Sequence, residues 1–220
     1  MSLHFLAIVV ALSMRHLPQL LIDLRHRDRV PTATRPTPVR GAYVTLLYGA
    51  ICAPSLLGLA EGAQAAVTAG ALGVGAFGLG WALGLAGLLA IRQYYTEDIS
   101  ICPGFKLVRT GVYGLVRHPI RLGLALEALG LILMTELYVL LPVWLAMVAL
   151  QLIRSRQEDD FLRQQLGDDA VQYQRYVPAV NLPLGTWRRL RQVMTNWTAR
   201  GTGARTRGDS AGAPKQRLPV

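Results

Sequence analysis

The sequence is poor in charge and in cysteine, and both shortages exclude classes of protein. Only 16% of its 220 residues are charged, whereas 52% are hydrophobic, so the chain is more apolar than an ordinary soluble domain. Its two cysteines, Cys52 and Cys102, form no C-x-x-C pair, which argues against a disulfide framework and a zinc site. The four histidines are scattered and predict no metal centre. We therefore expect a membrane protein without a metal.

Acidic residues are also scarce, since 13 Asp and Glu stand against 23 Lys and Arg, for a net charge of +10. In a soluble protein this excess would favour nucleic-acid binding. Here the basic residues fall at the ends of apolar segments and in the C-terminal tail, where they set topology and contact anionic lipid. The bilayer is therefore the predicted partner, and no nucleic acid is expected.

Long apolar segments predict an all-α membrane protein with about five transmembrane helices. Each is long enough to cross a hydrocarbon core of about 30 Å, and the last is long enough for a helical hairpin that turns near Thr135 and Glu136. The first contains Arg15, His16 and Asp23, but it lacks the basic start and the cleavage site of a signal peptide. The segments are residues 3–24, 42–60, about 65–91 and 120–153.

Basic residues are concentrated in the loops 25–41 and 92–119 and in the chain after Ile153, whereas the N-terminus and the turns at Glu61 and Glu136 carry none. The positive-inside rule then predicts an outer N-terminus and a cytoplasmic C-terminus. Four parts follow: three N-terminal transmembrane helices (1–91), a core (92–183), an interfacial amphipathic helix (184–198) and a basic tail expected to be disordered (199–220).

A glycine-rich stretch in the third apolar segment resembles a dinucleotide fingerprint. Residues 73–78 read G-x-G-x-x-G, and Glu97 follows about 20 residues later, as that motif requires. The motif also needs a preceding strand and a loop that opens a helix, whereas this stretch lies inside a segment of helical length. We therefore predict close helix packing through small residues, including Gly80-x-x-x-Gly84.

Two polar segments, 105–121 and 154–176, flank the predicted hairpin, so the hairpin brings them to the same side of the membrane. The first is cationic and the second is rich in carboxylates, which suits a zwitterionic cofactor together with an acidic amphiphile. The alternative is that they are membrane anchors and mutual salt bridges. The polar residues are Lys106, Arg109, Tyr113, Arg117, His118 and Arg121 in the first segment and Arg154, Arg156, Glu158, Asp159 and Asp160 in the second.

Each polar segment carries a motif. "LVRTGVYGLVRHPI..G" resembles the "LVTSGPYRYVRHPxYxG" element of the isoprenylcysteine carboxyl methyltransferase family and its phospholipid methyltransferase relatives. "EDDFL...LG....YQRYVP" resembles the "EExxLxxxFGxxYxxYxxxVP" element that follows their hairpin. Members of the family are integral membrane enzymes that transfer the methyl group of S-adenosylmethionine to a lipid-like acceptor. The resemblance covers about residues 92–183 and implies the same function, with catalytic segments at the cytoplasmic face of a bacterial inner membrane.

The resemblance also implies roles for individual residues. Arg154 matches the substrate-facing arginine, and Glu127 matches a glutamate in some bacterial relatives, although it could instead pair with Arg15 or Arg92. Arg154, Glu158 and Arg117 are the candidate catalytic residues. The candidate cofactor-binding residues are Phe105, Lys106, Leu107, Val108, Tyr113, His118, Pro119, Ile120, Arg121 and Glu158.

The acceptor is less well specified. A carboxylate is ionised near neutral pH and needs no base, and Arg154 suits it through a fork-shaped pair, so carboxyl O-methylation is the first expectation. Phospholipid amines, phenolic lipids and thiols remain alternatives, and an amine or phenol would need Glu158, Asp159 or Tyr113 as base. NADPH-dependent sterol-type reductases share an "RHPNY-G"-like element, and a scaffold or small transporter is the alternative without catalysis. Oligomeric state is not predicted.

The chain departs from the family pattern at a few positions. Arg121 stands where the family usually has Tyr, Phe105 where some members have His, and Asp159 replaces a second Glu, while three extra residues precede Tyr173. Arg121 bears most on the acceptor, because a cation there selects an anionic substrate. The alternative is that Arg121 anchors its helix among lipid headgroups.

Overall fold

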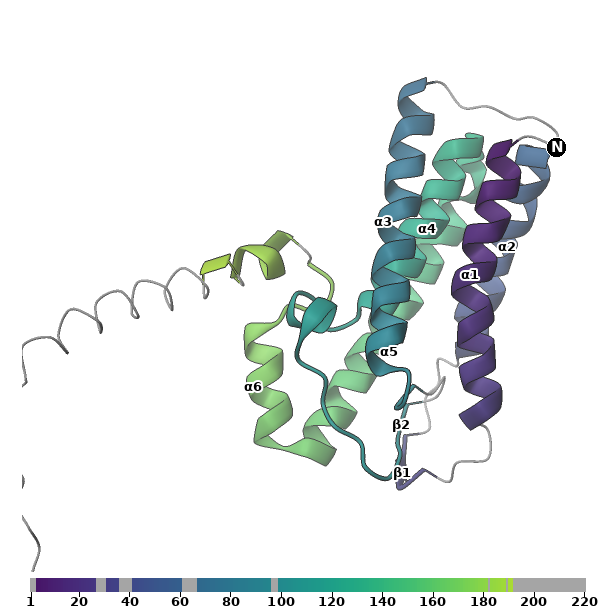
Figure 1. Cartoon of the computed structure of the whole chain (residues 1–220). Coiled ribbons are helices and arrows are strands. Elements are labelled where there is room, and N and C mark those ends of the chain that lie inside the picture. The colour runs from purple at the N-terminus through teal and green to yellow at the C-terminus, as the bar shows by residue number, and fades with distance from the viewer. Residues whose placement is uncertain are drawn as a thin grey trace, which may run out of the picture.

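A computed structural model of the chain describes residues 3–26, 31–35, 41–60, 67–95, 99–181, 183–188 and 190–191. Long helices run side by side as a bundle (Figure 1), and the expected all-α class is confirmed. The long helices are α1 (Leu3–His26), α2 (Gly41–Ala60), α3 (Val67–Ile91), α4 (Pro119–Thr135) and α5 (Leu141–Leu166). The short elements are β1 (Ala33–Thr34), β2 (Ser100–Ile101), the 3-10 turns η1 (Gly111–Gly114) and η2 (Tyr138–Leu140), and α6 (Asp168–Tyr176).

Two of the described helical stretches, Thr68–Ile91 and Tyr138–Leu166, are long and apolar enough to cross a membrane, and Ala42–Gly58 is a shorter apolar helix. The long helices lie in the apolar segments that the sequence predicts to be transmembrane helices. The number of crossings and their direction remain predictions.

The predicted hairpin is present and turns where expected. Helix α4 ends at Thr135, and Glu136 adopts a left-handed conformation with φ 54°. Helix α5 continues beyond the apolar segment to Leu166 and stops at Gly167, whose φ of 55° suits glycine. The polar residues after Ile153 are therefore carried rigidly by the same helix that forms one arm of the hairpin.

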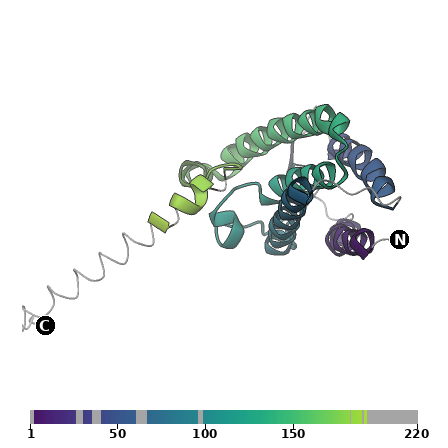
Figure 2. The same ribbon diagram turned by 90° about the horizontal axis from the view of Figure 1, so that it is seen from above.

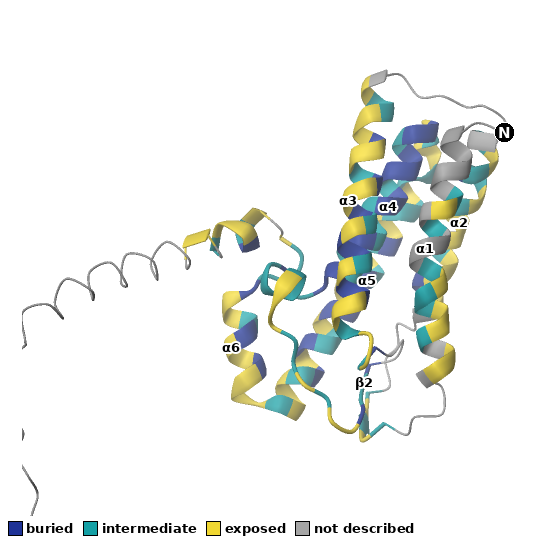
Figure 3. Cartoon of the chain, in the orientation of Figure 1, coloured by how far each residue is buried: buried dark blue, intermediate teal, exposed yellow. Residues whose placement is uncertain are grey.

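The core of the bundle is α4, which is buried along most of its length (Figure 3) and lies between α3, α2 and α5. Viewed from above, α1 stands at the edge of the bundle (Figure 2). Fully buried side chains include Ile132 on α4, Ile51 on α2 and Met147 on α5. Their contact fixes the position of α4 relative to α2 and α5. Because α4 begins at the candidate site, this packing also positions the residues of its first turn.

Glycines bring α3 and α4 into backbone contact. A Cβ at Gly80 would lie 2.6 Å from the carbonyl oxygen of Gly123, and one at Gly130 would lie 2.6 Å from the carbonyl oxygen of Gly73. Gly73, Gly80 and Gly87 recur every seven residues, so they share one face of α3. This face confirms the prediction of small-residue packing.

The dinucleotide fingerprint is excluded, because residues 73–78 lie within the continuous helix α3. A Cβ at Gly75 or Gly78 would have no neighbour within 4 Å, unlike one at Gly80. Sequence alone did not separate the packing glycines from these outward-facing ones.

A short antiparallel pairing was not predicted. Residues Ala33 and Thr34 of the first basic loop pair with Ile101 and Ser100, and the Thr32 amide donates to the Ile101 carbonyl at 2.8 Å. Arg35 also donates through Nη1 to the carbonyl of Gln157 on α5 at 2.9 Å. The loop after α1 is thereby tied to the candidate site.

The predicted interfacial helix is described in part. Residues 183–188 and 190–191 are helical, Trp187 is exposed, and the guanidinium of Arg191 lies 5.4 Å from its ring centroid. Met194, Trp197 and the tail 199–220 lie outside the described residues, as do Glu61 and Glu97.

We predict that Gly80→Ala lowers stability by about 1–3 kcal/mol, because the new methyl group overpacks against backbone atoms of α4 that cannot yield. Gly78→Ala is the matched control, and the higher helix propensity of Ala makes it neutral or slightly stabilising. Thermal unfolding of both variants in the same detergent checks this. Equal melting temperatures for the two variants would contradict the glycine contact.

Candidate functional site

The site begins at a turn formed by the "CPG" sequence. The Phe105 amide donates to the Cys102 carbonyl at 3.1 Å, and Gly104 has φ 78°. Proline followed by glycine suits the two central positions of a type II turn. The turn delivers Phe105 into a cavity, where its ring packs against Tyr94 with centroids 5.5 Å apart.

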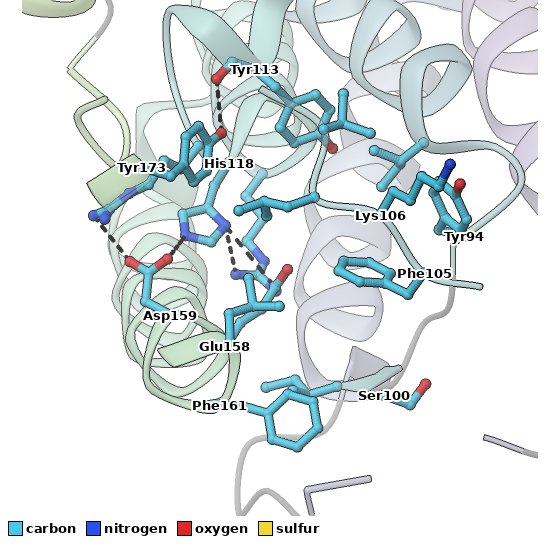
Figure 4. A pocket seen from close by; sticks show the side chains of 17 residues that line it. Tyr94, Ser100, Phe105, Lys106, Tyr113, His118, Glu158, Asp159, Phe161 and Tyr173 are labelled. Carbon is cyan, nitrogen blue, oxygen red and sulfur yellow. Dashed lines mark hydrogen bonds and ion pairs between the residues drawn. The ribbon is translucent and has the colours of Figure 1, made fainter. Parts of the chain in front are cut away.

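Backbone hydrogen bonds join the two sequence motifs. The amides of Arg117 and His118 donate to the carbonyls of Pro178 and Ala179 at 3.0 and 3.1 Å. The Tyr173 hydroxyl donates to the Tyr113 carbonyl at 2.8 Å, as Figure 4 shows. The "RHP" segment is thus held by the end of the second motif before α4 begins at Pro119.

A chain of charged side chains connects these segments to α5. Arg117 Nη2 lies 3.0 Å from Asp159 Oδ2, and His118 Nε2 lies 3.2 Å from Asp159 Oδ1. On the other side of the ring, Arg121 Nη1 lies 3.3 Å from His118 Nδ1, and Arg121 Nη2 donates to Glu158 Oε2. The imidazole therefore lies between two carboxylates of α5 (Figure 4).

These contacts indicate which tautomer of His118 is present. A guanidinium has only donors, so His118 Nδ1 must accept from Arg121 and Nε2 must donate to Asp159. The proton is thereby placed on Nε2, and His118 acts as a bridge between Arg121 and Asp159.

The first cavity lies between the loop after α3, η1 and the polar end of α5 (Figure 4). Aromatic rings and aliphatic side chains form much of its wall, and charged groups gather at one side. Its lining residues are Ile91, Tyr94, Ile99, Ser100, Phe105, Lys106, Leu107, Val108, Tyr113, Arg117, His118, Arg121, Glu158, Asp159, Phe161, Leu162 and Tyr173.

A second cavity lies among the helices, between α1, α2, α4 and α5. Six residues line both cavities, namely Ile91, Tyr113, Arg117, His118, Arg121 and Glu158. We call these six residues the shared wall. The remaining residues of the second cavity are His16, Gln19, Val44, Thr45, Tyr48, Tyr95, Ile120, Leu124, Gln151 and Arg154.

Burial changes the acidity of three groups at the site. It raises the pKa of the Tyr113 phenol, with the negative charge of Glu158 adding to the effect, and it raises the pKa of Tyr173. It lowers the pKa of the Arg117 guanidinium, an effect that Asp159 opposes. Both phenols therefore stay protonated near neutral pH, and Tyr113 is a poor candidate for the base that an amine or phenol acceptor would need.

Most residues expected to bind the cofactor line the first cavity, but two do not. Pro119 is buried at the start of α4, where it and Ile120 pack against Gly87 of α3, and Ile120 lines the second cavity instead. Of the three candidate catalytic residues, Arg117 and Glu158 belong to the shared wall, and Arg154 is buried and lines only the second cavity.

Glu127 does not line either cavity, and its expected role at the substrate stays a prediction. It is fully buried, and its Oε2 accepts from the Tyr48 hydroxyl at 2.9 Å and lies 3.7 Å from His16 Nε2. The Arg15 side chain is not described, and Arg92 is exposed at the end of α3. Glu127 therefore contacts two residues of the second cavity wall, Tyr48 and His16.

Sequence reasoning missed several lining residues. Tyr173 was available from the second motif, whereas Tyr94, Ile99 and Ser100 come from a loop without a diagnostic pattern. The polar residues of α1 and α2 were not recognised as cavity walls, although His16 was noted as an interruption of the first apolar segment.

We predict that Asp159→Ala destabilises the protein by about 2–4 kcal/mol, because it leaves the largely buried guanidinium of Arg117 without its counter-charge. Asp160→Ala removes an exposed pair with Arg163 and costs less than about 1 kcal/mol. Chemical unfolding of both variants measures the difference. Similar losses for these adjacent residues would show that the Asp159 network is not structural.

Comparison with known proteins agrees with this architecture. The model of the isoprenylcysteine carboxyl methyltransferase family matches residues 73–164, which include most of α3, the loop with the first motif, the hairpin and most of α5. The comparison with curated proteins found no match. The match supports membership of the isoprenylcysteine carboxyl methyltransferase family, which is a family of methyltransferases.

Proposed function

We propose that the protein uses S-adenosylmethionine as methyl donor and methylates the carboxylate of a lipophilic acceptor of the isoprenylcysteine type. The observation that carries the proposal is the pair of cavities with a shared wall. One cavity is bounded by loops and charged groups, and the other lies among apolar helices. A polar donor and an apolar acceptor can therefore meet at the wall.

The residues of the first cavity fit the donor. Glu158 offers a carboxylate to an ammonium group or to ribose hydroxyls, and the rings of Tyr94 and Phe105 suit a flat base or a cation. Within the described part of the chain, the backbone amides of residues 106–108 make no hydrogen bond. These amides are available to a ligand carboxylate.

The residues of the second cavity fit an acceptor with an oxygen-bearing end. Arg154 lines the cavity, and Gln151 lies one helical turn before it on α5. The Gln151 side chain is buried, and its Nε2 makes no hydrogen bond to any described residue. A donor of this kind supports binding of a carboxylate, while Val44 and Leu124 offer apolar contact to the tail.

Methyl transfer to a carboxylate is an in-line displacement. A carboxylate oxygen forms a bond to the methyl carbon, the carbon–sulfur bond breaks, and its electron pair stays on sulfur, which becomes a neutral thioether. The products are a methyl ester and the demethylated donor, and no proton is released. The protein need only align the reactants and exclude water, which agrees with a Tyr113 phenol that stays protonated.

The acceptor class is tested with methyl-labelled S-adenosylmethionine and the full-length protein in lipid nanodiscs. We expect label on an S-farnesyl-N-acetylcysteine carboxylate, released as methanol by alkali, and none on its carboxamide, on phosphatidylethanolamine or on a lipid phenol. Arg154→Met lowers kcat/KM about 10- to 100-fold through loss of charged hydrogen bonds. Arg156→Met, an exposed neighbour on α5, is the control. Alkali-stable label on the amine or phenol would overturn carboxyl methylation.

We propose the orientation that the basic loops predict, with the site at the cytoplasmic face. The arrangement supports it, because the N-terminal end of α1 and the α4–α5 turn lie at one end of the bundle, and β1, β2 and α6 lie at the other (Figure 1).

The orientation is tested in a Cys52→Ala, Cys102→Ala background with single cysteines at two exposed positions, Tyr138→Cys in η2 and Asp168→Cys after α5. An impermeant maleimide added to intact spheroplasts is expected to label Tyr138→Cys alone, and permeabilised membranes to label both. Labelling of Asp168→Cys in intact spheroplasts would reverse the proposed orientation.

A further inference from the structure

Arg121 occupies an unusual place, because it lines both cavities and bonds the cofactor-side carboxylate. It lies in the first turn of α4, three residues after His118, and its side chain is 18% exposed. It donates through Nη2 to Glu158 and through Nη1 to Ser155 Oγ at 2.9 Å. Both partners lie on α5, one turn apart, so the guanidinium spans the shared wall from α4 to α5.

The ion pair between Arg117 and Asp159 is less exposed to solvent. Asp159 accepts from Arg117 and His118 through its two oxygens, and its carbonyl accepts from Gln174 Nε2 at 2.8 Å. Side-chain exposure is 13% for Arg117 and 9% for Asp159. Both oxygens of the Asp159 side chain are already engaged, so a ligand has less to gain from this pair.

The Arg121–Glu158 pair is more accessible to solvent and to ligands. The Glu158 side chain is 35% exposed and lines both cavities. A ligand cation in the first cavity competes with Arg121 for the charge of Glu158, and a ligand anion in the second cavity competes with Glu158 for Arg121. The pair is the point where both ligands act on the same contact.

The charges of the proposed donor determine which of the two groups, Arg121 or Glu158, each ligand binds. S-adenosylmethionine carries a sulfonium, an ammonium and a carboxylate, so its net charge is positive. Its binding at Glu158 leaves the charge of Arg121 less compensated, with Arg154 also lining the second cavity. Like charges in a poorly solvated site repel strongly, and an anionic group in the second cavity relieves that repulsion.

We infer that Arg121 is a specificity-determining residue, which selects acceptors with an anionic end and couples their binding to that of the methyl donor. The inference rests on the proposed function. Each ligand must weaken the same ion pair, so the second to bind meets a pair that is already open. Linkage then requires donor and acceptor to raise each other's affinity by the same factor.

An uncharged residue at this position removes the coupling. Tyrosine, which usually stands here in the family that the motif resembles, carries no charge near neutral pH. Arg121→Tyr therefore leaves Glu158 accessible to the donor. In this variant an anionic acceptor no longer binds more tightly than a neutral one.

The test uses titration calorimetry on the full-length protein in nanodiscs, with S-adenosylmethionine as titrant. The acceptor mimic is a farnesyl thioether that ends in a sulfonate, and its matched control ends in a neutral sulfonamide. We expect the sulfonate at saturation to lower the Kd of the donor about 5- to 100-fold, which is the range of ordinary coupling between sites. The sulfonamide is expected to change it less than about 2-fold.

Two variants complete the design. In Arg121→Tyr, the sulfonate is expected to change the Kd of the donor less than about 2-fold. Arg109→Gln is the control, because it breaks an exposed pair with Asp169, and it is expected to keep the full change in Kd. The sulfonate–sulfonamide comparison needs no variant and so remains decisive if Arg121→Tyr does not fold.

The outcomes separate the two proposals. Donor binding with equal response to sulfonate and sulfonamide, or an undiminished sulfonate response in Arg121→Tyr, overturns the role of Arg121 and leaves the proposed function standing. Absence of donor binding by the wild-type protein overturns the proposed function, and the coupling with it.

Discussion

The carboxylate of Asp159 is the contact on which the site depends. It binds His118, 41 positions away in the chain, and Arg117 beside it, and so joins the start of α4 to the polar end of α5. Without a counter-charge, the largely desolvated guanidinium of Arg117 would be more stable in solvent than in the wall between the cavities. With it, His118 is oriented, and His118 in turn accepts from Arg121. One buried carboxylate therefore sets the position of two arginines and a histidine.

The glycine contacts between α3 and α4 provide the second constraint. Because backbones touch at Gly80 and Gly123, the height and rotation of α4 are fixed against α3. The first turn of α4 carries Arg121, and the end of α3 carries Ile91, which lines both cavities. Backbone packing in the bundle thus determines the geometry of the wall at its end.

Hydrophobic length, turn residues and motif order predicted the positions of the helices, the turn at Glu136 and the meeting of the two polar segments. They did not predict which carboxylate takes which partner. Glu158 and Asp159 are neighbours on α5 and look equivalent in sequence, yet helical rotation of about 100° turns one to Arg121 and the other to Arg117. The partners of Glu127 and the pairing of β1 with β2 were also inaccessible, because they depend on contacts between distant segments.

The second cavity divides its walls unequally between the two halves of the chain. Its arginines come from the segment that matches the family, residues 73–164, but His16, Gln19, Val44, Thr45 and Tyr48 come from α1 and α2, which lie outside it. The segment that carries the family signature therefore supplies only part of the second cavity, and the remainder of its wall comes from α1 and α2. Substitutions in α1 and α2 can therefore change the shape of the second cavity without altering the sequence that carries the family signature.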